Sequence, residues 1–407
     1  MKILHVGKYF SPFSGGLENY MRDAMVALAQ RGIASIALVH RHSLSLRTTD
    51  ETFTASGHKF HVIRTGMWAR FLYTPISPAF PWHLRRIIKI ASPDILHLHM
   101  PNPSVFWTLI LPSARRIPWV VHWHSDVITS AQGGWMRLVY KIYRPFEQAV
   151  LKRAKAIVVT SLPYRDSSQP LEKWLPKCRV VPLGVDTKKY GVPTPVGGAS
   201  TRRLSITETK SRQSPRDAPP TTCTLQVLAV GRLTYYKGFR YLIEAAAQAP
   251  NIHINLVGLG EQEEQLKTLA TSLKLQDRVT FHGSVNDTEL ARQMENCDCL
   301  CLPSIERTEA FGMVLLEAMF FGKATIIGDV EGSGMGWVVD DDITGIKVQP
   351  ENSDDLAKAL NRLATNREEL LRMGQQGKKK FDQHFEINHA VEGLVDIYRE
   401  IETNKQQ

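Results

Sequence analysis

The sequence of 407 residues has no apolar run of the roughly 18 residues that a membrane-spanning helix needs, so we expect no transmembrane segment. Its N-terminal stretch, Met1–Val6, has one charge, a short apolar run and no small-residue cleavage site. These features predict a first β-strand rather than a signal peptide. We therefore expect a cytoplasmic protein.

Cysteine is scarce, and its odd number fits a reducing compartment in a chain without a secretion signal. The five residues are Cys178, Cys223, Cys297, Cys299 and Cys301. The last three alternate, so a strand would place them on one face, but no second ligand cluster stands at a recognised spacing. We expect buried thiols that pack as small apolar side chains rather than a metal site.

The sequence also lacks a nucleic-acid-binding motif, although its net charge of +10 indicates an anionic partner. We therefore expect a phosphorylated substrate or an acidic lipid, and no nucleic acid. The hydrophobic content of 43% and the charged content of 22% are typical of globular proteins. A chain of this length exceeds one ordinary core, so two domains are expected.

The first 40 residues have the pattern of a Rossmann-type opening. A strand over Ile3–Gly7 precedes a loop that ends in Gly15 and Gly16, and an amphipathic helix then leads to a strand over Ile33–Val39. The loop does not have the Gly-x-Gly-x-x-Gly spacing, so it gives no support to a dinucleotide site. A plain strand–helix turn is the alternative explanation of the two glycines.

Two further predicted strands, Asp94–Leu98 and Trp119–Trp123, end in histidines. Strand alternation places His122 and His124 on the same side, at the sheet edge where α/β folds bind their ligands. A zinc site from these histidines is the competing explanation. It is disfavoured because no cysteine or carboxylate stands at ligand spacing.

The second half opens with a strand over Leu225–Val230, followed by Gly231-Arg232 and, five residues after the arginine, Lys237-Gly238. The two glycines let the backbone adopt conformations that other residues disfavour, and the two cations lie at a strand–helix junction. This arrangement suits a diphosphate. A solvated turn with incidental cations is the alternative.

Further along, Glu309 precedes a helix predicted over Met313–Phe320, and Glu317 lies within that helix. Because the first amides of a helix lack intrahelical partners, the amides of Phe311–Val314 would attract anions. Carboxylates and free amides together suit a phosphorylated sugar. The alternative is that Glu309 only caps the helix and that Glu317 is solvated.

Together these motifs resemble retaining nucleotide-sugar glycosyltransferases of the GT-B type in family 4 (glycosyltransferase group 1). The resemblance rests on Gly231-Arg232 with Lys237-Gly238, on the Glu-x7-Glu pair of Glu309 and Glu317, and on Leu183–Asp186. It is strongest to bacterial polysaccharide mannosyl- and rhamnosyltransferases. It implies an α/β fold of two Rossmann-like parallel-sheet domains that face each other across a cleft.

The resemblance implies a role for each matching residue and a nucleoside diphosphate sugar as co-substrate, with GDP-mannose favoured over a UDP-hexose. Neither a cofactor nor a metal is expected, because no Asp-x-Asp motif stands at a plausible site. The implied catalytic residues are His124, Arg232, Lys237 and Glu309. The implied donor-binding residues are Gly15, Gly16, Gly231, Gly258, Phe311, Gly312, Met313, Val314 and Glu317.

The chain is expected to divide into an acceptor domain over 1–190, a linker over 191–222 and a donor domain over 223–385. Residues 191–222 are rich in proline, glycine and basic residues and have no apolar periodicity. In the family that the chain resembles, the last helix, here 386–407, crosses back to the first domain.

A lipid-linked saccharide is the acceptor that the resemblance implies, at the inner face of the cytoplasmic membrane. Cations interspersed with aromatic residues suit a lipid interface. The candidate membrane or acceptor residues are Arg64, Trp68, Arg70, Phe71, Arg85 and Arg86, with a second basic segment over Arg137–Lys155. An ordinary core-covering helix with a solvated basic face is the alternative.

Two other functions remain open from the sequence alone. A nucleotide-sugar epimerase could use the same scaffold, but it would need further acid–base groups in the cleft. A non-catalytic nucleotide- or lipid-binding subunit is the other alternative, and the intact Arg232 and Glu309 count against it.

Overall fold

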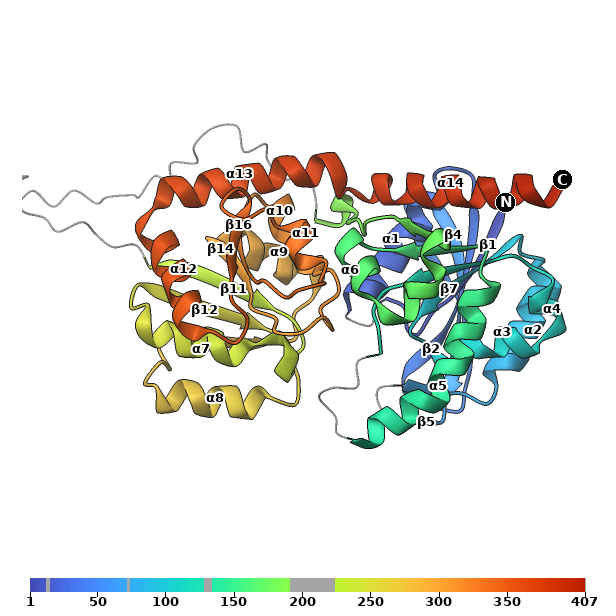
Figure 1. Cartoon of the computed structure of the whole chain (residues 1–407), viewed down its shortest axis with the longest axis horizontal. Helices are drawn as coiled ribbons and strands as arrows, with labels where there is room; N and C mark the ends of the chain where they lie inside the picture. Colours follow the sequence, from blue (N-terminus) through green and yellow to red (C-terminus); the bar gives the residue numbers. More distant parts are fainter. Residues whose placement is uncertain (12–14, 72–73, 128–133, 191–223, 407) are drawn as a thin grey trace, which may run out of the picture.

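The computed structural model describes residues 1–11, 15–71, 74–127, 134–190 and 224–406. Within them the chain forms two α/β domains, each around its own parallel sheet (Figure 1). The predicted linker, 191–222, and Cys223 lie outside the described residues.

The first domain contains an eight-stranded sheet in the order β10-β9-β8-β7-β1-β2-β4-β3, and a small hairpin of β5 and β6. In the eight-stranded sheet, neighbouring strands pair in parallel except β3, which is antiparallel to β4 at the sheet edge. The hairpin strands β5 and β6 are antiparallel. The strands are β1 (Lys2–Val6), β2 (Ala34–Leu44), β3 (Thr49–Ala55), β4 (His58–Met67), β5 (Ala69–Phe71), β6 (Thr74–Ile76), β7 (Ile95–Met100), β8 (Trp119–Trp123), β9 (Ala156–Val159) and β10 (Cys178–Val180).

Helices cover both faces of this sheet, which explains why its central strands β1, β7 and β8 are buried almost throughout rather than alternating between buried and exposed residues. The α-helices are α1 (Gly16–Ala29), α2 (Phe80–Ala91), α3 (Trp107–Ile110), α4 (Pro112–Arg115), α5 (Gly134–Arg153) and α6 (Leu162–Ser167). Short 3₁₀ turns are η1 (Pro103–Phe106), η3 (Gln169–Lys177) and η4 (Thr187–Tyr190).

The second domain has a six-stranded, all-parallel sheet in the order β13-β12-β11-β14-β15-β16. Its strands are β11 (Leu225–Val230), β12 (Ile252–Val257), β13 (Val279–Gly283), β14 (Cys299–Leu302), β15 (Ala324–Gly328) and β16 (Gly345–Val348). Its helices are η5 (Tyr235–Lys237), α7 (Phe239–Gln248), α8 (Glu263–Ser272), α9 (Asp287–Asn296), α10 (Met313–Phe320), α11 (Met335–Val338), α12 (Ser353–Thr365) and α13 (Arg367–His384).

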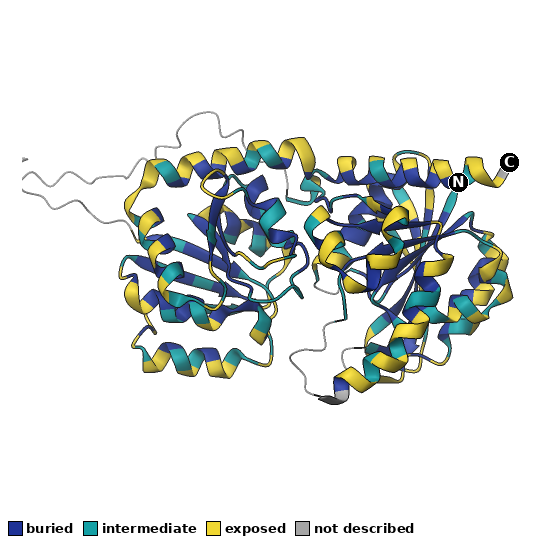
Figure 2. Cartoon of the chain, viewed as in Figure 1, coloured by how far each residue is buried: buried dark blue, intermediate teal, exposed yellow. Residues whose placement is uncertain are grey.

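The central strands of both sheets are buried, and the helices around them are buried on one side and exposed on the other (Figure 2). Cys299 and Cys301 lie on β14 and are fully buried, as expected. Cys297 is also buried, but it follows α9 and packs in a different apolar cluster. The expectation that all three thiols share one strand face is therefore wrong, because the strand begins only at Cys299.

The last helix, α14 (Ile387–Gln406), leaves the second domain and packs along the first, as the resemblance implied (Figure 1). Its Tyr398 hydroxyl lies 2.5 Å from His97 Nδ1 on β7. Near its start, the amide of Ile387 donates to the carbonyl of Val185. Of the helices that the structure describes, none is long and apolar enough to cross a bilayer.

Candidate active site at the domain interface

The turn before α10 presents Glu309 at the start of a buried helix. Gly312 caps this helix with φ at +81°, and a Cβ there would lie 2.7 Å from Leu315 Cδ1, so the position favours glycine. The Ser333 hydroxyl donates to the Glu309 carbonyl at 2.5 Å, and the Gly334 amide donates to the Ala310 carbonyl at 2.9 Å. The loop after β15 therefore fixes the Glu309 turn.

Lys237 and Glu309 form a nearly buried ion pair between η5 and this turn. Their side chains are 11% and 13% exposed. Burial alone would lower the pKa of Lys237, but the charge and hydrogen bond of Glu309 outweigh it and raise that pKa. The lysine is therefore held charged at the end of β11, within 5.9 Å of the Tyr236 ring centre.

Two glycines at neighbouring strand ends leave room beside this lysine. Gly258 has φ at +140°, and a Cβ on it would lie 1.9 Å from the Gly231 carbonyl oxygen. A Cβ on Gly231 would lie 3.0 Å from the Lys237 Nζ. Close backbone approach therefore explains both predicted donor-binding glycines.

The predicted donor-binding residues of both domains meet at the interface. A Cβ on Gly16, at the start of α1, would lie 3.0 Å from the Cβ of Met313, at the start of α10. Gly15 lies beside the Glu18 carboxylate in the same turn. The first amides of both helices lack intrahelical acceptors by position. Phe311 contributes only its backbone here, because its ring is buried against Trp337 and Phe385.

Sequence reasoning missed a group of charged residues that face Arg232 from the first domain. The pKa of Lys8 falls to about 8, mainly because of burial; Glu18 opposes this change, whereas Arg232 and Arg70 add to it. Burial raises the pKa of Glu18, which Lys8 and Arg232 partly offset. Three cations and one carboxylate thus interact across the interface. Lys8 follows the first strand, so the rule that ligands bind at strand ends could have identified it.

Glu317 lies on α10 beside η4, the last described segment of the first domain, and not beside Lys237, which pairs with Glu309. Its Oε1 accepts a hydrogen bond of 2.7 Å from the Tyr190 hydroxyl, and Lys189 Nζ is 3.6 Å away. The structure therefore brings Glu309 to Lys237 and Glu317 to a separate pair of residues.

His124 follows β8 directly and is 5% exposed. Its Nε2 lies 2.9 Å from His99 Nδ1, while its Nδ1 is buried without a partner among the described residues. Burial lowers its pKa to about 3, so the ring is neutral. His122 and His124 do stack on the same side, with centroids 4.2 Å apart.

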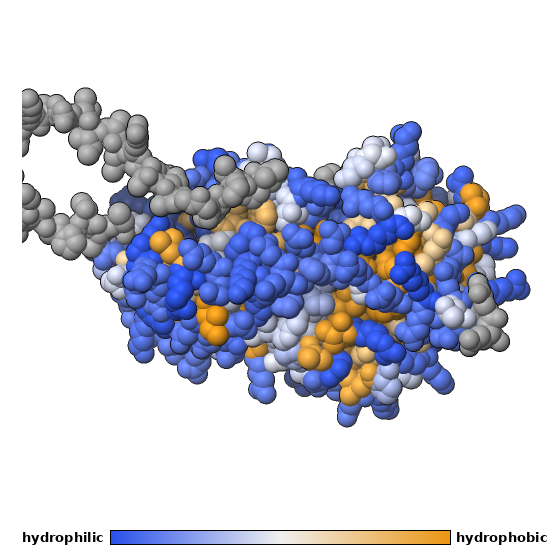
Figure 3. All heavy atoms as spheres, turned by 90° about the horizontal axis from the view of Figure 1, so that it is seen from above, coloured by the Kyte–Doolittle hydropathy of each residue, from blue (hydrophilic) through white to orange (hydrophobic). Residues whose placement is uncertain are grey.

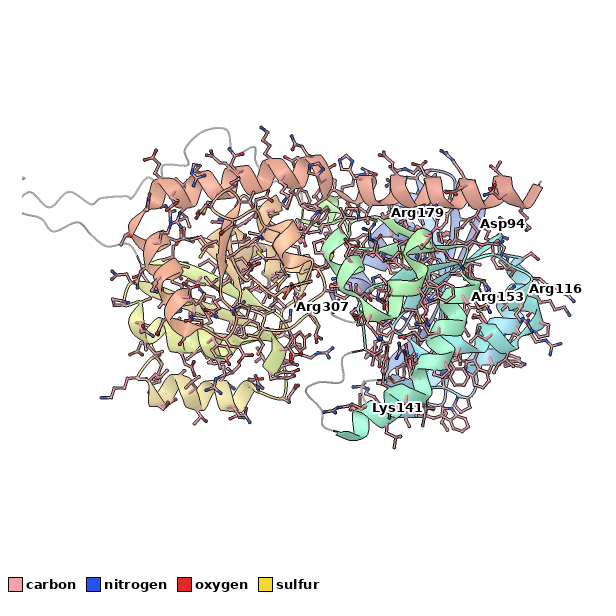
Figure 4. The ribbon with its side chains drawn as sticks, in the orientation of Figure 1. Asp94, Arg116, Lys141, Arg153, Arg179 and Arg307 are labelled. Atoms are coloured by element: carbon pink, nitrogen blue, oxygen red, sulfur yellow. The ribbon has the colours of Figure 1, made fainter. Side chains whose placement is uncertain are left out.

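An interdomain ion pair holds the Glu309 turn against the first domain. Arg307 Nη2 lies 3.3 Å from Asp126 Oδ2, and its guanidinium stacks 4.8 Å from the Tyr164 ring centre. Arg307 projects into the space between the domains (Figure 4). Asp126 is itself fixed by Trp123 Nε1 at 2.9 Å and by the Ser168 hydroxyl at 2.6 Å. No motif in the sequence indicates this contact, because Arg307 and Asp126 lie 181 residues apart.

The candidate membrane residues lie in different environments. Arg64 is 9% exposed on β4, where it donates to the carbonyls of Phe10 and Ser11 and pairs with Glu51 at 3.0 Å. The prediction that Arg64 faces lipid is therefore wrong, because its guanidinium supports the first loop. Arg70 is exposed, donates to the His42 carbonyl at 2.7 Å and belongs to the group around Lys8.

Three of the remaining candidates are exposed, as a membrane contact requires. Trp68 is 54% exposed, and Arg85 and Arg86 lie on the exposed face of α2. The side chain of Phe71 lies outside the described residues.

Two family models match the chain, one for each domain. The model described as Glycosyltransferase Family 4 matches residues 14–189, and the model described as Glycosyl transferases group 1 matches residues 212–380. Among curated proteins, the chain is 28% identical over 402 residues to the O-antigen chain mannosyltransferase C of Escherichia coli, covering 98% of both chains. It is also 28% identical over 386 residues to the D-rhamnosyltransferase WbpZ of Pseudomonas aeruginosa, covering 95% of this chain and 92% of the relative.

Solved structures show the same fold. The sucrose-phosphate synthase of Thermosynechococcus elongatus superposes with a TM-score of 0.76 at 22% identity, covering 99% of both chains. WaaG, a glycosyltransferase involved in lipopolysaccharide biosynthesis, superposes with a TM-score of 0.70 at 18% identity, covering 97% of this chain and 99% of that one. The fold is GT-B, as predicted, and the chain belongs to the family 4 (group 1) glycosyltransferases.

Proposed function

We propose that the protein is a retaining hexosyltransferase of bacterial surface polysaccharide synthesis. It takes an α-linked sugar from GDP-mannose or a relative, with a UDP-hexose as the second choice, and transfers it to a lipid-linked saccharide. Two relatives that match nearly the whole chain are named as a mannosyltransferase and a rhamnosyltransferase, which supports this donor. The observation that carries the proposal is the Lys237–Glu309 pair with Arg232 beside it.

The chemistry that these residues can perform is stabilisation of a leaving diphosphate. In the transfer, the bond from the sugar C1 to the diphosphate oxygen breaks, and the acceptor hydroxyl oxygen forms the new bond. The acceptor proton leaves with the diphosphate, whose developing charge lies beside Lys237 and Arg232. Such preorganised charges usually make the largest contribution to catalysis of this kind. Glu309 accepts hydrogen bonds from sugar hydroxyls, and His124 approaches the sugar from the first domain.

We further propose that no divalent metal is needed at the diphosphate. Arg232, Lys237 and Lys8 supply three cations there, and these can perform the electrostatic work of a bound Mg²⁺ or Mn²⁺. A chelator should therefore leave the rate of transfer unchanged. An activity that requires added Mn²⁺ and disappears with chelator would contradict this part of the proposal.

The donor is tested by incubating the full chain with GDP-mannose, GDP-rhamnose and several UDP-hexoses together with lipid-linked acceptors. NMR of the product reports the anomeric configuration, which must equal that of the donor for a retaining enzyme. Calorimetry with GDP and UDP separates the two base choices. Tighter binding of UDP would reverse the donor preference, and epimerised donor without transfer would indicate an epimerase.

We also propose that α5 contributes the membrane-facing surface of the first domain. Leu138, Ile142 and Phe146 recur at intervals of four, so they share one helix face, and they are 62%, 66% and 47% exposed. Exposed cations flank them at Lys141 and Arg144. Lys141 lies on α5 (Figure 4). Seen from above, hydrophobic patches also interrupt the hydrophilic surface elsewhere on the first-domain side (Figure 3). Apolar side chains beside cations suit an anionic lipid surface.

Co-sedimentation with vesicles of anionic phospholipid tests this surface. Ile142→Glu combined with Lys141→Glu should abolish binding, which for the wild type should weaken as salt rises. The control is Lys358→Glu with Lys379→Glu, two exposed positions of the second domain. Wild-type protein that stays in the supernatant at low salt would refute membrane binding, and equal losses in both variants would refute the assignment to α5.

A further inference from the structure

A cavity at one edge of the first-domain sheet is lined by many cations. Its volume is about 300 Å³. Its walls come from the end of α4, the end of α5, the starts of β8 and β9, β10 and the last turns of α14. We call it the basic cavity, because six of its lining residues are basic: Arg115, Arg116, Arg153, Lys155, Arg179 and Lys405.

The basic cavity and the active site lie at opposite edges of the sheet. Trp119, which lines the cavity, is the first residue of β8, whereas His124 directly follows the last. With a rise of about 3.3 Å per residue, the five residues of β8 separate the two edges by roughly 16 Å. Arg116 and Arg153 accordingly lie on the outer side of the first domain, away from Arg307 between the domains (Figure 4). The diphosphate of the donor therefore does not account for these cations.

The positive charge of the basic cavity is largely uncompensated within the part of the chain that the structure describes. Of the residues that line the cavity there, Glu400 is the only acidic one, and its Oε1 lies 3.8 Å from Arg179 Nη2. The side chains of Arg116 and Lys155 are exposed and form no hydrogen bond or ion pair with the described residues. Like charges that converge in this way repel one another and destabilise the folded chain, so a bound anion would be favoured.

Stabilisation of a helix end does not explain the convergence. Cations near a helix C-terminus interact favourably with its dipole, and α5 ends at Arg153. However, Lys177 Nζ already donates to the carbonyls of Lys152 and Ala154 at 2.6 and 2.9 Å. Burial lowers the pKa of Lys177, and the charge of Lys155 lowers it further. Lys155 therefore adds repulsion at this helix end rather than a cap.

The wall formed by α4, α5 and β8 is held in place by contacts within the chain. The Arg153 guanidinium lies 4.9 Å from the ring centre of Trp119, which is 1% exposed. Arg153 also donates to the Arg115 carbonyl. Trp119 Nε1 donates to the Ala114 carbonyl at 2.9 Å, which fixes the indole beneath the guanidinium. Side chains that are already ordered lose less entropy when a ligand binds.

We propose that the basic cavity binds an anion with at least two phosphate groups, at a site separate from the donor site. Four of the six cations are arginines, and a guanidinium binds phosphate oxygens through two parallel hydrogen bonds. One phosphate group can contact only part of a set of cations that comes from five elements. The volume is at the lower end of the roughly 300–1,000 Å³ of small-molecule sites, which suits a compact polyphosphate.

The bound anion would connect elements that are distant in the sequence. Arg116 and Lys155 belong to the body of the first domain, whereas Lys405 belongs to α14, which follows the second domain in the chain. The ligand would therefore strengthen the attachment of α14 to the first domain. The free energy of unfolding would then rise with the concentration of the ligand. This site does not depend on the proposed transfer reaction.

Calorimetry with inorganic tripolyphosphate tests the site in the full chain at about 150 mM salt. The cavity variant, Arg116→Ala with Lys155→Ala, should bind tripolyphosphate about 10-fold or more weakly at one site, because two charge-assisted contacts are lost. Neither side chain has a partner among the described residues, so the variant should fold as the wild type does.

The matched control is Lys358→Ala with Lys379→Ala, which removes the same charge from exposed positions of the second domain. It should bind tripolyphosphate as the wild type does. Equal weakening in the cavity variant and the control would overturn the proposal, since binding would then follow the overall charge of the chain.

Acetylation of lysines, followed by peptide mass spectrometry, locates the ligand without any substitution. Tripolyphosphate should slow the acetylation of Lys155 and Lys405 several-fold in the wild type, while Lys358 reacts at an unchanged rate. Unchanged rates at Lys155 and Lys405 would overturn the proposal, because the probe would then bind elsewhere, for example beside Lys237.

Vesicles of anionic phospholipid distinguish a soluble ligand from a lipid headgroup as the source of the phosphate groups. We expect the cavity variant to keep its vesicle binding, because the proposed membrane contact is the apolar face of α5, and the ligand is then soluble. If the variant loses both affinities and tripolyphosphate releases the wild type from vesicles, the ligand is a headgroup with the same chemistry. Loss of vesicle binding with unchanged affinity for tripolyphosphate would overturn the proposal, because the cavity would then not recognise phosphate groups.

Discussion

The ion pair between Lys237 and Glu309 allows stability and catalysis to be separated in one experiment. Lys237→Met keeps the length of the side chain but leaves the Glu309 carboxylate only 13% exposed and without its cation. Breaking a buried pair from one side costs about 3 kcal/mol or more, because an uncompensated charge remains in the interior. The double variant Lys237→Met with Glu309→Gln removes both charges, so most of the lost stability should return.

Activity should respond differently from stability. A charge-assisted contact with the leaving diphosphate contributes about 1.5–3 kcal/mol, which corresponds to a loss of roughly 10- to 150-fold in kcat/KM. This loss should persist in the double variant, because the cation is still missing. Urea unfolding and initial-rate kinetics on the same preparations measure the two effects. A single variant as stable as the wild type would refute the buried pair, and a double variant with wild-type turnover would refute the catalytic role of Lys237.

Three further predictions follow from the interface. The pKa of Lys8, about 8 in the folded chain against a usual 10.5, means that the unfolded chain binds more protons between these values. The free energy of unfolding should therefore rise as pH rises through this window, and Lys8→Met should remove this pH dependence in unfolding experiments. The affinity for GDP should fall above pH 8 in the wild type but not in Lys8→Met. Arg307→Ala should weaken donor binding several-fold in calorimetry, since the ion pair with Asp126 holds the Glu309 turn, and Asp126→Asn should do the same; an effect of one variant without the other would contradict this explanation. Gly258→Ala should destabilise the second domain by at least about 2 kcal/mol in thermal unfolding, because its Cβ would meet the Gly231 carbonyl. Gly57→Ala, where φ is also positive at +78° but nothing lies within 4 Å of the added Cβ, should cost less.

Local patterns in the sequence predicted the secondary structure around the second-domain site. The helix expected over Met313–Phe320 has these same bounds in the structure, with Gly312 as its cap. The helix prediction succeeded because glycine punctuation, apolar periodicity and helix starts are properties of short segments. The roles assigned to Lys237 and Glu309 stay predictions, and their mutual ion pair was not predicted from the sequence.

Contacts between distant segments could not be predicted in the same way. Arg64 stands among aromatic and basic residues in the sequence, but strand pairing turns it inward, where it bonds the loop after β1. A buried cluster of five histidines forms through the register of β1, β7 and β8, and its members are His5, His97, His99, His122 and His124. The sequence alone therefore did not indicate that His5 belongs to the same cluster as His122. The ion pair of Arg307 and Asp126 spans the two domains and depends on their relative placement. In each case the partner lies far away along the chain.

The path of α14 has a consequence for the order of events during synthesis. Val391, Leu394 and Tyr398 are at most 1% exposed and belong to the same apolar cluster as Ile3 and Val120 of the first sheet. The first domain therefore lacks part of its core until the 20 residues of α14 have been made. Domains usually fold as units in the order of translation, and this one must instead wait for a helix that follows the second domain in the chain. Nascent chains that stall after the second domain should consequently expose apolar surface on the first.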